Sequence, residues 1–283
     1  MKPDAAEIRR QVAAALAEDI GGGDLTAALV PVDQQARAHV VAREDAVICG
    51  QAWFECAFRE LDANTKFTWF CPEGGQVRAD GRVATVQGQA RALLSAERCA
   101  LNFLQTLSGT ATVTAKYVAA MDNDHCRLLD TRKTIPGLRH AQKYATKVGG
   151  AHNHRMGLYD MVLIKENHIM AAGGISQAVT LARRTAGAAR IEVEVENLAE
   201  LRNALAAEPD IIMLDEFSLA EMREAVALNR QRATPVPLEA SGSIDLHNIA
   251  EVAATGVDYV SVGAITKHLR AIDLSMRFEF GGG

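Results

Sequence analysis

From about residue 107 onward the chain alternates short apolar runs with helical patterns, and this alternation limits its fold more than any other feature. The apolar runs are residues 127–129, 161–164, 191–195, 211–214, 236–239 and 259–262. The helical stretches between them include residues 175–185, 198–207, 219–229 and 246–254. Repeated strand–helix units imply a parallel sheet buried by helices. Six clear strands fall short of eight, so an incomplete α/β barrel competes with an open doubly wound sheet.

The region up to about residue 106 has a different texture. A helical pattern covers residues 4–18, strand-like runs lie at 36–43, 66–70 and 82–87, and further helical patterns lie at 51–61 and 91–105. Its strands are not regularly separated by helices, which is typical of an α+β arrangement. A helix near residues 111–121 is predicted to open the second region.

Charge and cysteine content narrow the class of protein. The 283 residues carry a net charge of -5 without a block of like charge, which argues against a general nucleic-acid binder. A cationic site must then be a local pocket that attracts an anion. The five cysteines form no CxxC pair, so reduced thiols are the simplest interpretation. No apolar stretch suits a signal peptide or a membrane span, and we expect a cytoplasmic protein.

Polar residues or glycines lie at the end of every predicted strand of the second region. They are Asp130-Thr131-Arg132-Lys133, Lys165-Glu166-Asn167-His168, the Glu192, Glu194 and Glu196 series, Asp215-Glu216, Ser241-Gly242-Ser243 and Gly263-Ala264. The chemistry of parallel α/β barrels lies at the carboxyl ends of their strands. The agreement among six strands therefore predicts one active site at this edge.

Several of these residues are cations. Arg132 and Lys133 could belong to a solvated loop, but the Pro136-Gly137 turn that follows fixes the backbone and favours binding of a carboxylate or phosphate. Lys165 ends an apolar run, where it could contact an anion, form a Schiff base or extend to solvent at the rim.

A glycine-containing loop at residues 149–155 adds two histidines and an arginine. His152 and His154 could suggest a metal, but no adjacent carboxylate or thiolate completes a zinc set. Contact of His154 and Arg155 with an anion is therefore favoured, and a structural hydrogen bond remains the simplest role for His152.

Glu194 and Asp215 place carboxylates opposite this cationic cluster, provided that the third strand is central in the sheet. Such hard oxygens suit magnesium bound jointly with substrate phosphates, or ribose hydroxyls. The turns at residues 241–243 and 262–264 expose backbone N–H groups before helix starts, which is the expected phosphate position. A phosphorylated sugar that carries a further polyanion, together with a carboxylate-bearing acceptor, would use all of these groups.

Long motifs along the chain resemble those of the quinolinate phosphoribosyltransferase family, also called carboxylating nicotinate-nucleotide pyrophosphorylases. They are residues 18–26 (EDIGGGDLT), 130–139 (DTRKTIPGLR), 152–160 (HNHRMGLYD), 163–168 (LIKENH) and 261–267 (SVGAITK). The resemblance covers nearly the whole chain. Ala151 stands where a third glycine is common in the family, and Glu216 where asparagine is common, but neither change removes a charged site residue.

The resemblance implies a fold, a reaction and an assembly. The reaction is quinolinate with phosphoribosyl pyrophosphate, giving nicotinate mononucleotide, pyrophosphate and carbon dioxide, with magnesium. The fold would be an N-terminal α/β sandwich of residues 1–106, joined by residues 271–283, and an incomplete α/β barrel of residues 107–270. The assembly would be a homodimer or higher homo-oligomer in which Arg98 enters the neighbouring site. From the sequence alone, Arg98 would pass as a surface charge on a helix.

The strand-end pattern and the resemblance together give the expected site. The expected substrate-binding residues are Arg98, Thr131, Arg132, Lys133, His154, Arg155, Lys165, Glu194, Asp215, Ser241, Gly242, Ser243, Val262, Gly263 and Ala264. The expected catalytic residues are Lys133, Lys165, Glu194 and Asp215, and the last two are also the expected magnesium ligands.

Three other functions stay open at this point. A related phosphoribosyltransferase could use a monocarboxylate such as nicotinate, although the excess of cations favours a dicarboxylate. Lys165 could make the protein a Schiff-base aldolase or lyase. The chain could also bind a phosphorylated ligand without catalysis. We expect neither nucleic acid nor membrane as a partner.

Overall fold

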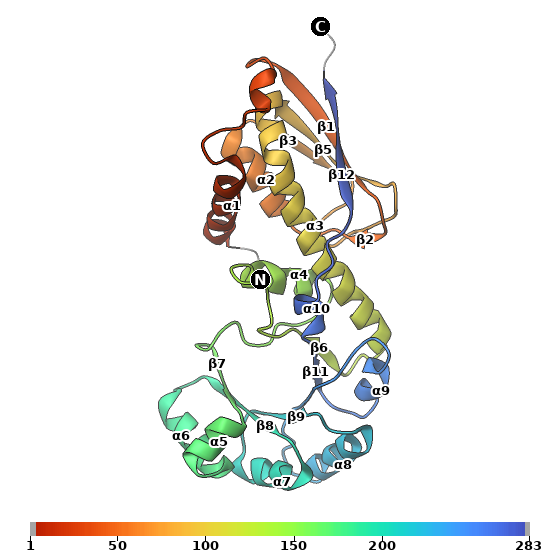
Figure 1. The fold of residues 1–283 in the computed structure, drawn as a ribbon. Helices are drawn as coiled ribbons and strands as arrows, with labels where there is room; N and C mark the ends of the chain where they lie inside the picture. Colours follow the sequence, from red (N-terminus) through yellow and green to blue (C-terminus); the bar gives the residue numbers. More distant parts are fainter. Residues whose placement is uncertain (1–3, 281–283) are drawn as a thin grey trace. The chain divides into compact units, whose positions relative to one another are not determined.

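The computed structural model describes residues 4–280, which fall in two compact units (Figure 1). The first unit consists of Met1–Ala115, Thr134–Gly150 and Thr266–Gly283, and the second of Lys116–Lys133 and Ala151–Ile265. The domain limits drawn from the sequence at residues 106 and 270 stay a prediction, and residues 281–283 of the expected C-terminal extension lie outside the described residues.

An antiparallel sheet covered by helices forms the first unit. The strand order is β12 (Leu274–Phe280), β1 (Gln35–Ala42), β5 (Arg82–Gln89) and β3 (Lys66–Trp69). Helices α1 (Ala5–Ile20), α2 (Gln51–Leu61) and the first part of α3 (Ala90–Met121) lie on one side of this sheet (Figure 1). Buried and exposed residues alternate along β1, because successive side chains point to opposite faces. The apolar core includes Val40, Phe54 and Leu101.

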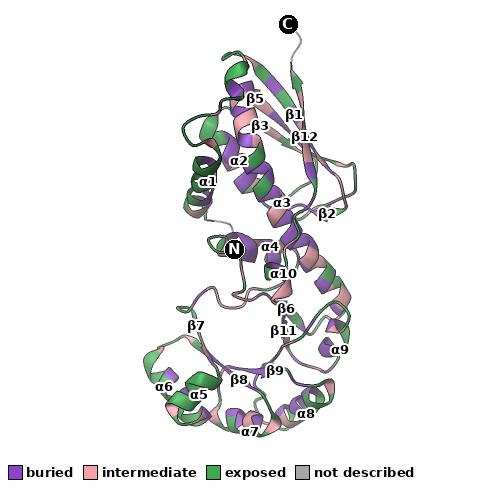
Figure 2. Ribbon diagram, in the orientation of Figure 1, coloured by how far each residue is buried: buried purple, intermediate pink, exposed green. Residues whose placement is uncertain are grey.

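The second unit is built on a six-stranded parallel sheet. Its strand order is β6 (Arg127–Leu129), β11 (Tyr259–Ser261), β10 (Leu238–Ser241), β9 (Ile211–Asp215), β8 (Arg190–Val195) and β7 (Met161–Ile164). The helices that follow the strands are α5 (Glu166–Ala172), α6 (Ile175–Thr185), α7 (Leu198–Ala207), α8 (Leu219–Arg230) and α9 (Ile249–Ala253). They lie outside the curved sheet, and the strands between them are largely buried (Figures 1 and 2). An open doubly wound sheet has helices on both faces. The predicted combination of an incomplete α/β barrel with an N-terminal sheet domain is therefore confirmed.

The helix α3 corrects one prediction. Two helices were expected at residues 91–105 and 111–121, but a single helix of 32 residues covers both. The Ser, Gly and Thr residues between them look like a loop by composition. In the structure Ser108 accepts a hydrogen bond from the Cys49 N–H (2.9 Å), and Thr112 accepts one from the Val47 N–H (2.9 Å). Tertiary partners thus satisfy side chains that would otherwise weaken the helix.

Other differences are local. The strand expected at residues 236–239 is β10, which begins two residues later, because both backbone groups of Val236 bond to the Asn229 side chain. The sequence analysis did not predict α4 (Arg139–Val148), α5 or β12. The short elements η1 (Ala27–Leu29), β2 (Ala46–Val47), β4 (Gln76–Val77) and α10 (Ala264–Lys267) complete the fold.

Residues 4–280, which the structure describes, contain neither a membrane-spanning helix nor a disulfide. No helix there is long and apolar enough to cross a membrane. All five cysteines lie in this range and none of them forms a disulfide.

Candidate active site

A pocket of about 440 Å³ lies at the carboxyl ends of the strands of the second unit. It is lined by Thr131, Arg132, Lys133, His154, Arg155, Leu163, Lys165, Glu194, Met213, Asp215, Glu239, Ser241 and Ser261. Side chains from the ends of all six strands or from the loops after them therefore meet in one place, as the parallel topology requires.

The pocket brings together most, but not all, of the expected site residues. Those that line it are Thr131, Arg132, Lys133, His154, Arg155, Lys165, Glu194, Asp215 and Ser241. Gly242, Ser243, Val262, Gly263 and Ala264 follow β10 and β11 in the same unit but do not line this pocket. Arg98 is an exposed residue of α3 in the first unit.

Lys133 and Arg155 illustrate how the cations are placed. The Lys133 N–H donates to the Thr131 hydroxyl (3.1 Å). A Cβ atom at Gly263 would come within 2.9 Å of Lys133 Cδ, so the glycine leaves room for this side chain.

Arg155 lies close to a second cation. Burial and then the neighbouring Arg132 guanidinium lower the pKa of Arg155, which shows that two like charges are close together. An anion between them would relieve that repulsion.

Lys165 follows β7 and forms an ion pair with Glu194 at the end of β8. The lysine side chain is 47% exposed and the glutamate 10%, so the pair lies at the mouth of the pocket. The Lys165 N–H donates to His168 Nδ1 (3.1 Å) at the start of α5, which fixes the backbone where strand becomes helix.

Three titratable groups form a buried cluster at the pocket, and two of them, His154 and Glu239, line it. His154 Nε2 is 2.9 Å from Glu192 Oε2 and 3.5 Å from Glu239 Oε2, and both glutamates are fully buried. Burial opposes the charged imidazole, but the bonds to Glu192 and Glu239 outweigh it and raise the pKa of His154 to about 9. Burial, and then the charge of Glu239, raise the pKa of Glu192 to about 7. The cluster therefore retains protons at neutral pH.

The position of the ring proton of His154 follows from the geometry. The Arg155 N–H donates to His154 Nδ1 (2.8 Å), which requires a lone pair on Nδ1 and leaves the ring proton on Nε2. The doubly protonated ring that a pKa of about 9 describes would set two N–H groups against each other at this distance, so the observed contact corresponds to the neutral ring.

Asp130 anchors the loop that carries His154. It is fully buried at the end of β6 and accepts bonds from the His154 N–H (2.9 Å) and the Asn153 side chain (2.6 Å). No separate role in the site was predicted for Asp130 or Glu239, and Glu192 entered the prediction only as a member of the series Glu192, Glu194 and Glu196. The period of two in Glu192, Glu194 and Glu196 was the available signal, since it places all three on one face of a central strand.

The turn after β10 already holds a carboxylate. Glu216 accepts hydrogen bonds from the Ser243 N–H (3.1 Å) and the Ser243 hydroxyl (3.1 Å). Gly242 has a φ of 120°, and a Cβ there would come within 2.7 Å of the Glu216 carboxyl carbon. The backbone of this turn can thus receive an anion, as the sequence analysis expected of a phosphate site.

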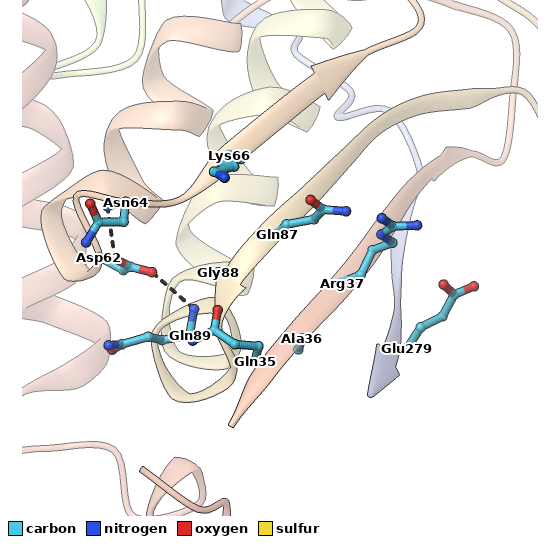
Figure 3. Close-up of a pocket in the computed structure, with 10 residues that line it drawn as sticks. All are labelled: Gln35, Ala36, Arg37, Asp62, Asn64, Lys66, Gln87, Gly88, Gln89 and Glu279. Carbon is cyan, nitrogen blue, oxygen red and sulfur yellow. Dashed lines mark hydrogen bonds between the residues drawn. The ribbon is translucent and has the colours of Figure 1, made fainter. Parts of the chain in front are cut away.

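A larger cavity of about 690 Å³ lies on the sheet of the first unit (Figure 3). Its lining consists of Gln35, Ala36, Arg37, Asp62, Asn64, Lys66, Gln87, Gly88, Gln89 and Glu279. The Asp62 carboxylate is held by the Asn64 and Gln89 N–H groups at 2.9 and 3.1 Å (Figure 3). No expected site residue lines this cavity, and amides dominate its polar groups, so its greater volume does not make it the active site.

Comparisons with family models, with curated proteins and with solved structures agree on one family. The family descriptions "Quinolinate phosphoribosyl transferase, N-terminal domain" and "C-terminal domain" match residues 24–108 and 110–277. A probable nicotinate-nucleotide pyrophosphorylase [carboxylating] of Synechocystis is 44% identical over 263 residues, which cover 93% of this chain and 89% of that protein. A mitochondrial quinolinate phosphoribosyltransferase [decarboxylating] of Nicotiana tabacum is 38% identical over 286 residues, covering 94% of this chain and 80% of that protein.

A solved structure agrees with these matches. The nicotinate-nucleotide pyrophosphorylase of Francisella tularensis superimposes with a TM-score of 0.94 at 48% identity, covering 98% of each chain. The resemblance inferred from the motifs is thereby confirmed. The chain belongs to the quinolinate phosphoribosyl transferase family.

Proposed function

We propose that this protein transfers the phosphoribosyl group of phosphoribosyl pyrophosphate to quinolinate and releases carbon dioxide, giving nicotinate mononucleotide and pyrophosphate. The observation that carries the proposal is the convergence of cations, carboxylates and hydroxyls from six strand ends in one pocket of about 440 Å³. Family membership supports the same reaction, because the similar proteins are named for this activity.

Quinolinate would occupy the cationic side of the pocket. Arg132 and Arg155 provide planar guanidinium groups that suit two carboxylates, and Lys165 adds a compact charge at the mouth. Arg98 of a neighbouring chain would complete this set in a homodimer or larger homo-oligomer. His154 lines the same pocket.

Phosphoribosyl pyrophosphate would occupy the side formed by β9, β10 and β11. Its 5-phosphate would bind the turns at residues 241–243 and 262–264, taking over donors such as the Ser243 N–H that now bonds to Glu216. Lys133, beside Gly263, would contact the phosphate-rich substrate together with Thr131. Glu194 and Asp215 would bind the ribose hydroxyls.

Magnesium is part of this proposal. Glu194 and Asp215 lie at the ends of the paired strands β8 and β9 and line the same pocket, so their oxygens are available to one cation. Acidic groups accumulate here: the Glu166 carboxylate first, and then others including Asp215 and Glu194, raise the pKa of Glu196. Such a set of oxygens fits magnesium shared with substrate phosphates. When bound, it would neutralise charge on the departing pyrophosphate.

The reaction depends on how the protein positions the two substrates and stabilises their charges, and it requires no nucleophile from the protein. The pyridine nitrogen attacks the anomeric carbon while the bond from that carbon to pyrophosphate breaks, so positive charge grows on the sugar. Glu194 and Asp215 stabilise that charge, and Lys133 and Lys165 stabilise the anions that are brought together. The quaternised ring then accepts the electron pair of the 2-carboxylate as carbon dioxide leaves, and a proton replaces it at that carbon.

The rival functions differ in what they require of Lys165. A Schiff-base lysine is an uncharged nucleophile, usually in an apolar pocket, whereas Lys165 is half exposed and paired with Glu194. This arrangement favours an anion contact. A cytoplasmic location, where both substrates would be available to an enzyme with unpaired cysteines, completes the proposal.

The direct test is incubation of the protein with quinolinate, phosphoribosyl pyrophosphate and magnesium. We expect carbon dioxide and nicotinate mononucleotide in equal amounts, and little product when nicotinate replaces quinolinate. Equal turnover of nicotinate would identify the monocarboxylate enzyme. Binding of phosphoribosyl pyrophosphate without any product, or borohydride trapping of a carbonyl compound on Lys165, would refute the proposed reaction.

A further inference from the structure

The ring of His154 makes its hydrogen bonds within the protein. Nδ1 accepts the Arg155 N–H at 2.8 Å, and Nε2 lies 2.9 Å from Glu192 Oε2. The side chain is only 8% exposed although it lines the pocket. With the proton on Nε2, the ring therefore has no N–H group directed at a substrate carboxylate.

Glu192 and Glu239 both lie close to Nε2 of His154. They come from β8 and β10, are 0% exposed, and lie 2.9 and 3.5 Å from Nε2. Two buried carboxyl groups cost stability compared with apolar side chains of similar size. Stability of the fold therefore does not explain why these two carboxyl groups are buried here, whereas a role in the active site would.

The backbone around Arg155 is fixed on both sides. Asp130 accepts the His154 N–H (2.9 Å) and His154 Nδ1 accepts the Arg155 N–H (2.8 Å). The Arg155 guanidinium in turn donates from Nη1 to the Met161 carbonyl at the start of β7 (3.2 Å). The imidazole therefore fixes the backbone from which the Arg155 side chain extends, and the Met161 carbonyl holds the guanidinium.

We propose that Glu192 and Glu239 are positioning residues for the dicarboxylate substrate: they hold the His154 ring, and His154 holds Arg155. The inference rests on the proposed function, which assigns Arg155 to quinolinate. It gives His154 an indirect role in place of a direct bond to the substrate. Loss of Glu192 should then weaken the use of quinolinate and leave the use of phosphoribosyl pyrophosphate unchanged.

A metal ion is the other occupant that these three side chains suggest. Their ligand atoms lie within 4.8 Å of one another. A metal on Nε2 would require the ring proton on Nδ1, where it would oppose the Arg155 N–H at 2.8 Å. The hydrogen-bonded arrangement therefore fits the backbone better than a metal centre does.

The experiment compares Glu192→Leu with Glu192→Gln by steady-state kinetics, with the exposed Glu224→Gln on α8 as a control. Leucine removes the acceptor for Nε2–H, and we expect the KM for quinolinate to rise about tenfold or more, the loss typical of a charged hydrogen bond. The KM for phosphoribosyl pyrophosphate and kcat should change less than threefold. Glutamine keeps an acceptor oxygen and should stay within threefold of the unmodified protein in all three constants.

Two results would overturn the inference. One is an unchanged KM for quinolinate in a folded Glu192→Leu protein, and the other is a stoichiometric metal in the purified protein that Glu239→Gln removes. If Glu192→Leu does not fold, His154→Asn and His154→Leu decide. Asparagine can place an oxygen near the Nδ1 position, so its KM for quinolinate should be at least fivefold lower than that of the leucine variant, and equal values would contradict the inference.

Arg155→Ala separates this inference from the proposed function. A normal KM for quinolinate in Arg155→Ala would refute the substrate placement itself. A raised KM in Arg155→Ala with a normal KM in Glu192→Leu would refute only the positioning role. A double variant with His154→Leu and Glu192→Leu should be no worse than either single variant, because both changes interrupt one chain of contacts.

Discussion

The Glu216 carboxylate bonds to both the N–H and the hydroxyl of Ser243, each at 3.1 Å, in the turn where we expect the 5-phosphate to bind. Glu216 also has a φ of 54°, which is uncommon for a residue other than glycine or asparagine. A phosphate that uses the same donors must displace this carboxylate and overcome its charge. Glu216 would therefore compete with the substrate.

Replacing Glu216 by asparagine should relieve this competition. Asparagine accepts the left-handed backbone more readily and carries no charge, so we expect the KM for phosphoribosyl pyrophosphate to fall about two- to fivefold, the range of an exposed charge interaction. The KM for quinolinate serves as the internal control and should not change. A higher KM for phosphoribosyl pyrophosphate would mean that Glu216 instead shapes the turn for the phosphate.

Gly263 should be sensitive to a single added methyl group. Its Cβ would come within 2.9 Å of Lys133 Cδ and 3.5 Å of the Thr131 hydroxyl. Because the lysine side chain is flexible, Gly263→Ala should change the free energy of unfolding by less than about 1 kcal/mol while it displaces the Lys133 ammonium. We expect kcat/KM for phosphoribosyl pyrophosphate to fall at least tenfold. Steady-state kinetics with urea unfolding on the same sample checks both parts, and unchanged kinetics would place Lys133 outside the reaction.

Gly109→Ala tests the close packing of α3. Alanine normally stabilises a helix by about 1 kcal/mol relative to glycine. Here its Cβ would lie 2.3 Å from the Arg270 carbonyl oxygen, and backbone cannot move aside cheaply. We expect a net destabilisation of about 1–3 kcal/mol by urea unfolding. Gly22→Ala is the matched control, since nothing lies within 4 Å of its Cβ and its φ is ordinary, and equal stability of the two variants would contradict the prediction.

The pair of Arg183 and Asp210 should contribute to the acid dependence of stability. Burial opposes ionisation of Asp210, but bonds from Arg183 (2.7 Å) and the Ile191 N–H (2.7 Å) outweigh it and lower its pKa. Because the folded-state pKa is below the unfolded value, the contribution is present above the ordinary pKa of about 3.9 and is lost as pH falls through the lower folded value. Asp210→Asn should therefore lower stability at pH 7 and reduce its decline between about pH 5 and 2. Parallel acid denaturation curves for both proteins would contradict this assignment.

Site residues that follow or end a strand could be predicted from the sequence, whereas contacts between distant residues could not. Arg132, Lys133, Lys165 and Asp215 directly follow or end apolar strands, and parallel strands bring such residues to one edge whatever the side-chain packing. Local sequence was therefore sufficient to place them together. Glu239 ends the predicted strand 236–239 but was not singled out, and in the structure it lies inside β10. Its contact with His154 joins residues far apart in the chain, which no local pattern specifies.

The same distinction applies to the fold. The strands β6 and β7 and the helices α2, α6 and α7 were predicted to the residue, since each has a strong period and clear ends. The continuity of α3 through Ser108 and Thr112 was not, because the bonds that satisfy those hydroxyls come from residues about sixty positions away.

The sequence by itself determined most of the strands and helices, the α/β class, and the set of charged residues at the strand ends, because these follow from local period and from the shared direction of parallel strands. Only the tertiary structure decided which hydrogen-bond partners those charged groups have. It joined His154 to Glu192 and Glu239 at the pocket and placed Glu216 on Ser243. Hydrogen bonds of this kind require residues far apart in the chain to be positioned to within a few tenths of an ångström, which no local pattern specifies.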